Sequence, residues 1–117
     1  MNQTTDERVA AARARMAELK QKFVERSQGE LQTLRDSFTA LQSGDATALR
    51  ELVQLAHRMS GTGATLGLEA LSDCAQRIEK LAEAQSPGSL PDADVMSRLG
   101  SAIEALATEL ARTPRDG

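Results

Sequence analysis

The residues best suited to carry out chemistry surround His57, the only histidine of the chain. Residues three and four apart share one face of a helix, so Gly61 lies one turn beyond His57, and Gln54 and Arg50 precede it on the same strip. A glycine inside a helix costs about 1 kcal/mol relative to alanine. Because Gly61 has no side chain, this spacing predicts an imidazole with free space beside it for an incoming group.

The composition predicts one all-helical domain. The 117 residues suffice for a single domain, and the good helix formers Leu, Ala, Glu, Gln, Arg and Lys dominate them. The chain lacks Trp and Tyr, and no segment alternates with period two, so a β-sheet is not expected. We expect one domain over residues 1–117, with loose ends at 1–4 and 113–117.

Charge and cysteine content exclude several classes of function. The net charge is −3, and no basic patch indicates binding to nucleic acid. A single Cys and a single His cannot supply the ligands of a zinc site, so no metal site is expected, and Cys74 is predicted to be a buried thiol. No apolar run approaches the roughly 20 residues of a membrane span, and no signal peptide is recognisable. We therefore expect a cytoplasmic protein that does not enter a membrane.

The first half of the chain is predicted to form two helices. Thr4 or Thr5 can cap a short helix that reaches about Arg15. A long helix follows, with or without a bend, and ends near Gln42. Its apolar residues recur at helical spacing, with a lapse over residues 26–29.

Turn residues divide the second half into three helices. Gly44 suits a left-handed C-cap, Asp45 suits the next N-cap, and Gly67 suits a turn. The expected helices cover about residues 46–64, 68–84 and from Asp92 onward. Short connections between amphipathic helices imply antiparallel neighbours. The predicted fold is therefore an all-α, up-down antiparallel four-helix bundle with an extra N-terminal helix.

The segment around His57 resembles the histidine-containing phosphotransfer (Hpt) domain family. That family has a histidine, any residue, a hydrophobic residue, Lys and Gly, then small residues and Leu-Gly, and residues 57–67 here read HRMSGTGATLG. The resemblance is specific over residues 52–81 and looser over 19–110. It implies that His57 accepts a phosphoryl group from an aspartyl phosphate on a receiver domain and passes it to another receiver.

The resemblance also implies what the chain does not need. The nucleophile is a neutral imidazole, which histidine supplies near neutral pH. Magnesium and the other catalytic groups come from the receiver, so no cofactor and no kinase or ATPase activity is expected in this chain. The implied partners are response-regulator receiver domains and a hybrid histidine kinase. The chain itself is expected to be a monomer and to act as a phosphocarrier.

One position departs from the family pattern. The usual lysine three residues after the histidine is Ser60 here, beside the expected phosphoryl group. A serine donates a hydrogen bond but does not neutralise charge. Arg50 or Arg58 could compensate, and Arg50 is preferred because Arg58 points about 100° away from His57 on a helix.

A second position concerns the orientation of the imidazole. In relatives, a polar residue of the following helix bonds to the ring, and counting forward without gaps gives Glu79. A carboxylate that accepts from Nδ1–H would fix the tautomer and leave Nε2 as the nucleophile. The alternative is a surface glutamate paired with Lys80 or Arg77, and the sequence does not choose between the two.

The expected contacts of a docked receiver surround the histidine and are Arg50, Gln54, Arg58 and Thr62. Two other functions stay open. One is a non-catalytic Hpt-like adaptor or inhibitor that binds a kinase or a receiver. The absence of the family's lysine at Ser60 is the reason to retain this alternative. The other is a purely structural bundle, which leaves the pairing of His57 with Gly61 unexplained.

Overall fold

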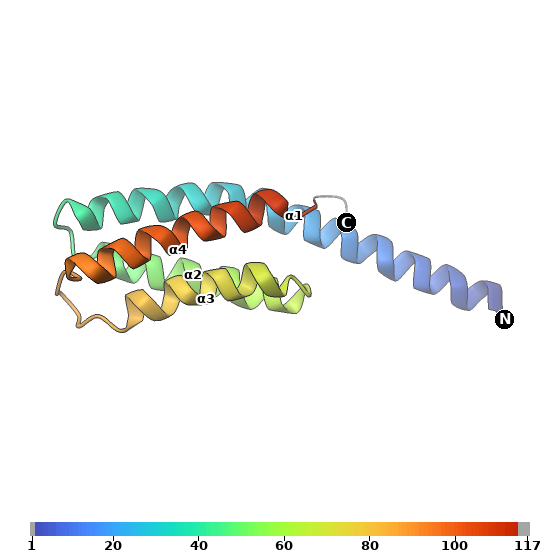
Figure 1. The fold of residues 1–117 in the computed structure, drawn as a ribbon. Helices are drawn as coiled ribbons and strands as arrows, with labels where there is room; N and C mark the ends of the chain where they lie inside the picture. Colours follow the sequence, from blue (N-terminus) through green and yellow to red (C-terminus); the bar gives the residue numbers. More distant parts are fainter. Residues whose placement is uncertain (1, 115–117) are drawn as a thin grey trace.

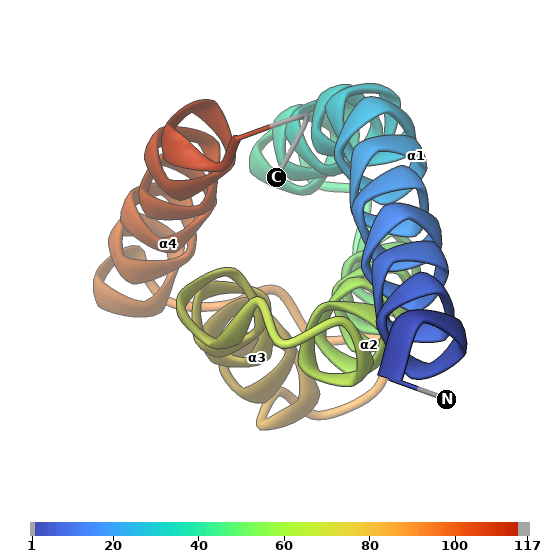
Figure 2. The ribbon, with the colours of Figure 1, turned by 90° about the vertical axis from the view of Figure 1, so that its right-hand side faces the viewer.

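The chain folds into four consecutive helices with no strand among residues 2–114, which are the residues described by the computed structural model. They are α1 (Asn2–Gln42), α2 (Ala48–Thr65), α3 (Glu69–Glu83) and α4 (Ala93–Arg112) (Figure 1). Each helix packs against the next, and α4 closes the ring against α1 (Figure 2). The predicted all-α antiparallel four-helix bundle is confirmed.

Helix α1 is one continuous helix of 41 residues, and it is as long as the molecule, which measures 62 × 21 × 18 Å. Its first buried residue is Phe23, so residues 2–22, here called the N-terminal extension, project beyond the bundle (Figure 1). The extra N-terminal helix is therefore a part of α1. The predicted break near Arg15 and the predicted cap at Thr4 or Thr5 are wrong. Strong helix formers fill this segment without Gly or Pro, so nothing interrupts the helix.

The other helix boundaries lie within two residues of those predicted, because turn residues mark them. Gly44 and Gly67 have φ angles of 104° and 77°, a left-handed conformation that glycine adopts without strain. The N-cap of α2 is Thr47, so the prediction of Asp45 as N-cap is wrong. The carboxylate of Asp45 instead accepts a hydrogen bond of 3.0 Å from the amide of Thr47. Asp92 caps α4 by accepting from the amide of Val95 at 2.9 Å.

The chain ends differ in part from the expectation of loose termini. Residues 2–4 belong to α1. Thr113 is joined to the last turn of α4, because its amide and its hydroxyl both donate to the carbonyl of Glu109. Residues 1 and 115–117 lie outside the described part of the chain.

The core lies on the axis of the bundle and draws on all four helices. Its largest fully buried side chains are aliphatic: Leu34, Leu41, Leu52, Met59, Leu71, Ile78, Leu99, Ile103, Leu106 and Leu110. Cys74 packs at the margin of this core and is half-buried, not buried as predicted. Burial still raises the pKa of the Cys74 thiol, and the nearby carboxylate of Glu109 adds to the effect.

One buried polar side chain weakens the packing of α1. Ser27 is completely buried, and its hydroxyl has no hydrogen-bond partner among the described residues. A buried hydroxyl without a partner costs about 1–3 kcal/mol, and alanine is the better helix former. We expect Ser27→Ala to raise the free energy of unfolding in urea by about 1 kcal/mol. Ser101→Ala, at an exposed position in α4, should gain only a few tenths. Equal gains would show that the Ser27 hydroxyl carries no such cost.

Candidate functional site

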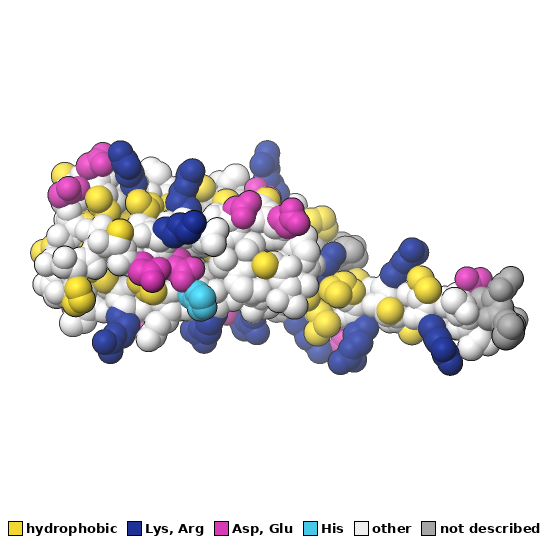
Figure 3. All heavy atoms as spheres, turned by 90° about the horizontal axis from the view of Figure 1, so that it is seen from below, with side chains coloured by type: hydrophobic (Ala, Val, Ile, Leu, Met, Phe, Trp, Pro, Cys, Tyr) yellow, Lys and Arg dark blue, Asp and Glu magenta, His cyan; other side chains and the backbone are white. Residues whose placement is uncertain are grey.

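His57 stands on the outer face of α2. Its neighbours Ala56 and Met59 are buried in the core, which fixes the rotation of the helix and turns residue 57 outward. The imidazole side chain is 72% exposed. In Figure 3 the histidine lies at the surface against acidic side chains. The sequence predicted partial exposure, and the ring is more accessible than that.

The structure brings Glu79 of α3 to the histidine. The Nδ1 atom of His57 lies 2.6 Å from Oε2 of Glu79, although the two residues are 22 positions apart. The turn at Gly67 reverses the chain between them and sets α2 and α3 side by side. Within residues 2–114, Glu79 makes no ion pair with Arg77 or Lys80. Of the two interpretations of Glu79, the geometry agrees with contact to the imidazole.

This contact determines the arrangement of protons on the ring. A carboxylate can only accept a hydrogen bond, so Nδ1 of His57 carries a hydrogen and donates it to Glu79. No hydrogen bond reaches Nε2 from any residue between 2 and 114. The Glu79 side chain is only 16% exposed, so its carboxylate lies against Nδ1 and is largely screened from water. Nε2 of a neutral His57 therefore keeps its lone pair free.

A hollow of about 640 Å³ opens beside the ring, between α1 and α2. Gly61 forms part of its wall, and a Cβ atom built at this position would meet nothing within 4 Å. Its backbone is ordinary right-handed helix, so neither a turn nor close packing requires glycine there. By contrast, a Cβ at Gly63 would touch Leu71 and Ser72 at 3.5 Å, where α2 meets α3. The glycine at position 61 has one visible effect, which is to keep the space beside His57 open.

Two residues of α1 complete the hollow, and the sequence did not identify them. Arg26 and Glu30 line its far wall and form an ion pair of 2.9 Å. The guanidinium of Arg26 also lies over the ring of Phe23, 5.6 Å from its centre. The available signal was the lapse in the apolar stripe over residues 26–29, which includes Arg26.

Ser60 does not line the hollow. The hydroxyl of Ser72 on α3 donates to the carbonyl oxygen of Ser60 at 2.7 Å, and the two hydroxyl oxygens are 3.2 Å apart. Ser72 has only one hydroxyl proton, so Ser60 is the donor in the second contact. The hydroxyl of Ser60 is therefore engaged with α3.

The four predicted docking residues separate into two groups. Arg58 and Thr62 line the hollow together with His57. Arg50 and Gln54 line another hollow, between the start of α2 and the end of α3. Arg58 and Arg26 are thus the cationic side chains that share the hollow with the histidine, whereas the sequence favoured Arg50.

Among residues 2–114, no cluster of three or more His, Cys, Asp and Glu side chains is arranged to hold a metal ion. None of the helices in that range combines the length and the apolarity needed to cross a membrane.

An exposed histidine held at one ring nitrogen, on an antiparallel four-helix bundle, is the arrangement of a phosphotransfer domain. The chain belongs to the Hpt domain family, whose model matches residues 18–111. Membership supports a histidine phosphotransfer role in phosphorelays, where Hpt domains interact with receiver domains and histidine kinases. No curated protein and no solved structure gives a significant match to the chain.

Proposed function

We propose that the chain is a phosphorelay intermediate that carries a phosphoryl group on Nε2 of His57 between receiver domains. The observation that carries this proposal is the pairing of an exposed imidazole with Glu79 at 2.6 Å through Nδ1. That pairing leaves the other ring nitrogen, Nε2, available as the nucleophile. The open hollow at Gly61 gives a phosphoryl group room beside it.

The proposed step is a direct displacement at phosphorus. The lone pair of Nε2 forms the N–P bond while the bond from phosphorus to the aspartyl oxygen of the receiver breaks, and the electrons of that bond leave with the aspartyl carboxylate. The imidazole ring then bears a positive charge, with its hydrogen still on Nδ1. The carboxylate of Glu79 lies against this hydrogen and stabilises the charge, which is the role of the carboxylate in a catalytic triad. Transfer to a second receiver reverses these bond changes.

Cationic support for the phosphoryl oxygens falls to the arginines of the hollow. Arg58 comes from α2 and Arg26 from α1. A charge-assisted hydrogen bond is about twice as strong as a neutral one, so either arginine can replace the lysine that the family pattern has at position 60. The hydroxyl of Ser60 would first have to leave Ser72.

The test is phosphorylation by a panel of receiver domains that are themselves loaded from acetyl phosphate with Mg²⁺. We expect the chain to acquire a phosphate that is labile in acid and stable in base, and its ³¹P resonance should show coupling to nitrogen in uniformly ¹⁵N-labelled protein. A base-labile or acid-stable phosphate would contradict the proposal. Stable binding of a receiver with no transfer at all would instead identify a non-catalytic adaptor, the function that the serine at position 60 keeps open.

The role of Glu79 can be measured without any partner. Phosphoramidate phosphorylates imidazoles directly, so its reaction reports on the ring alone. We expect Glu79→Ala to slow this reaction by about 10–100-fold, the usual cost of losing a residue that orients a functional histidine. Glu79→Gln should react at a rate between those of Glu79→Ala and wild type, because its amide oxygen still accepts from Nδ1–H but carries no negative charge to stabilise the ring.

A structural role alone would not reproduce this pattern. Imidazole ¹⁵N shifts should show the hydrogen on Nδ1 in the wild type and a mixture of tautomers in Glu79→Ala. Glu83→Ala, which removes an exposed carboxylate one turn further along α3, is the matched control and should change neither rate nor shifts. Equal rates for Glu79→Ala and Glu83→Ala would show that Glu79 has no role in orienting His57.

A further inference from the structure

The N-terminal extension carries most of the large apolar side chains that the fold leaves exposed. Among the described residues four such side chains are exposed, and three of them, Val9, Met16 and Leu19, lie on this extension at 44%, 40% and 41%. With Ala12 they recur at alternating intervals of three and four residues. We call these four residues the extension seam. An apolar row this narrow is the pattern of a coiled-coil contact, in which the four residues hold alternate a and d positions.

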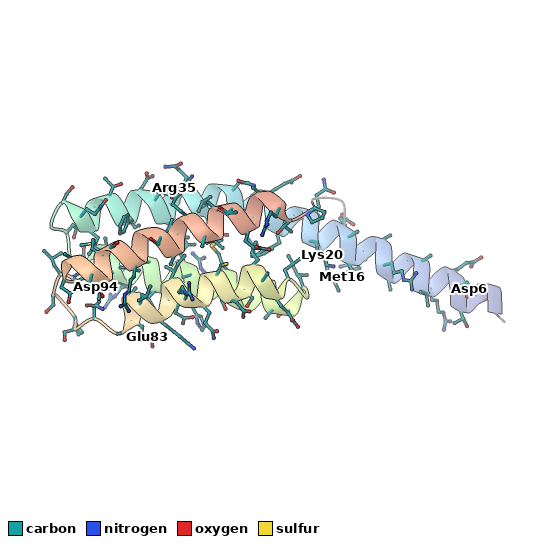
Figure 4. The ribbon with its side chains drawn as sticks, viewed as in Figure 1. Asp6, Met16, Lys20, Arg35, Glu83 and Asp94 are labelled. Atoms are coloured by element: carbon teal, nitrogen blue, oxygen red, sulfur yellow. The ribbon has the colours of Figure 1, made fainter. Side chains whose placement is uncertain are left out.

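Basic side chains flank the seam on both sides. The e and g positions beside it hold Arg13, Arg15, Lys20 and Lys22. The whole extension has five basic and three acidic residues, so its formal charge is +2, and the rest of the chain carries −5. Figure 3 shows hydrophobic side chains along the extension with Lys and Arg on both edges. Met16 and Lys20 lie where the extension leaves the bundle (Figure 4).

These charges disfavour a second copy of the chain as the occupant of the seam. In a parallel pair, Arg15 of one copy would face Lys20 of the other, since g and e positions meet. In an antiparallel pair, e meets e and g meets g, so basic residues again oppose each other. Like charges at such positions are destabilising.

A lipid surface fits the seam less well than a helix does. Helices that lie in a membrane interface bury a broad apolar face with large residues such as Trp, Phe and Leu. The seam is a single row, and two of its four members are Ala12 and Val9. A partner helix would fill such a row and cover it completely.

We propose that the extension is a docking helix for a partner protein that presents an amphipathic helix with Asp and Glu beside its apolar row. The partner supplies the apolar surface that the seam lacks and the negative charge that its flanks require. The family match begins only at residue 18, so most of the seam lies outside the part shared with Hpt domains.

The extension seam lies close to the hollow beside His57. The same helical row continues through Phe23 to Arg26 and Glu30, which line the hollow beside His57. Leu19 precedes Arg26 by seven residues, or about 10 Å along the helix axis. The extension and His57 also share the face seen in Figure 3. A partner held on the seam is therefore held next to the proposed phosphoryl acceptor.

The test uses the full chain and two synthetic 21-residue peptides with Leu and Ile at a and d. One peptide has Glu at every e and g position, and the other has Lys there. We expect fluorescence anisotropy to show at least tenfold tighter binding of the Glu peptide at low salt, with the difference shrinking at 0.5 M salt. Because no phosphoryl transfer is involved, the result is independent of the proposed function.

Three variants make the inference falsifiable. Reversing the flanks with Arg13→Glu, Arg15→Glu and Lys20→Glu together should invert the preference between the peptides. Met16→Ser with Leu19→Ser should abolish binding of both. Reversing Arg77, Lys80 and Arg98 to Glu, three exposed residues of α3 and α4, should change nothing.

Circular dichroism checks that each variant keeps its helix content. Equal affinity for the two peptides, or no binding of either, would overturn the proposal. A dimer of the wild-type chain in sedimentation at 100 μM would also overturn it. So would a wild-type chain that binds neither peptide but binds phosphatidylserine vesicles, if the Met16→Ser, Leu19→Ser variant no longer binds those vesicles.

Discussion

The His57→Gln protein is expected to take up no phosphoryl group from any receiver that phosphorylates the wild type, a loss of at least 10³-fold in initial rate. An amide nitrogen has no lone pair that can attack phosphorus, and the chain has no second histidine. The measurement is incorporation of ³²P from phosphorylated receiver into purified protein, resolved on neutral gels to preserve acid-labile phosphate.

Glutamine is chosen because it separates chemistry from folding. Its amide can still donate to the Glu79 carboxylate, which is mostly covered and would otherwise lose its partner. Since the imidazole is largely exposed, the free energy of unfolding should change by less than about 1 kcal/mol. Transfer to His57→Gln at the wild-type rate would place the phosphate on another residue and overturn the assignment.

Replacing Gly61 with Leu is expected to reduce phosphoryl transfer by about 10²-fold while leaving the fold intact. The leucine side chain would enter the space beside Nε2 that the incoming phosphoryl group needs, and a displacement of about 1 Å at a reacting centre costs a factor of this size. A Cβ at this position touches nothing, so the protein itself accommodates the change. Stability should rise, because leucine forms helix better than glycine.

Gly29 supplies a matched control for Gly61. It is also an exposed glycine inside a helix, and a Cβ there would meet nothing within 4 Å, but it does not line the hollow. Both Gly29→Leu and Gly61→Leu should raise the melting temperature, and only Gly61→Leu should slow transfer. Intermediate slowing by Gly61→Ala would support a graded steric effect. Full transfer by Gly61→Leu would show that the open space has no role.

The sequence predicted the bundle because local signals mark most of its boundaries. Gly44 and Gly67 end helices through their left-handed backbone, Asp92 begins one through its side-chain cap, and the structure uses all three in that way. The error over α1 has the opposite cause. No residue near Arg15 marks a boundary, since the apolar residues recur at helical spacing from Val9 through Leu19 to Phe23, and the predicted break there had no local signal behind it. The propensity of Ala, Arg, Glu and Lys maintains the helix there, although none of residues 4–22 is buried.

The sequence predicted the part of the site that lies within one helix. It did not predict the residues that packing between helices brings to the site. The pairing of His57 with Gly61 is one helical turn, so the sequence identifies it directly. Glu79 was reached only by counting along relatives, and the sequence left it undecided against an ion pair with Lys80 or Arg77. Arg26 and Glu30 were missed because the side of α1 that borders the hollow depends on how α1 packs on α2, which no local pattern encodes.

The short connection between the two helices of the site has a kinetic consequence. His57 and Glu79 belong to one hairpin, in which α2 and α3 are joined by residues 66–68 alone. Closing so short a loop costs little chain entropy, and helical bundles rich in such near-neighbour contacts fold within microseconds to milliseconds. The two residues therefore meet as soon as the hairpin docks, without waiting for α1 or α4.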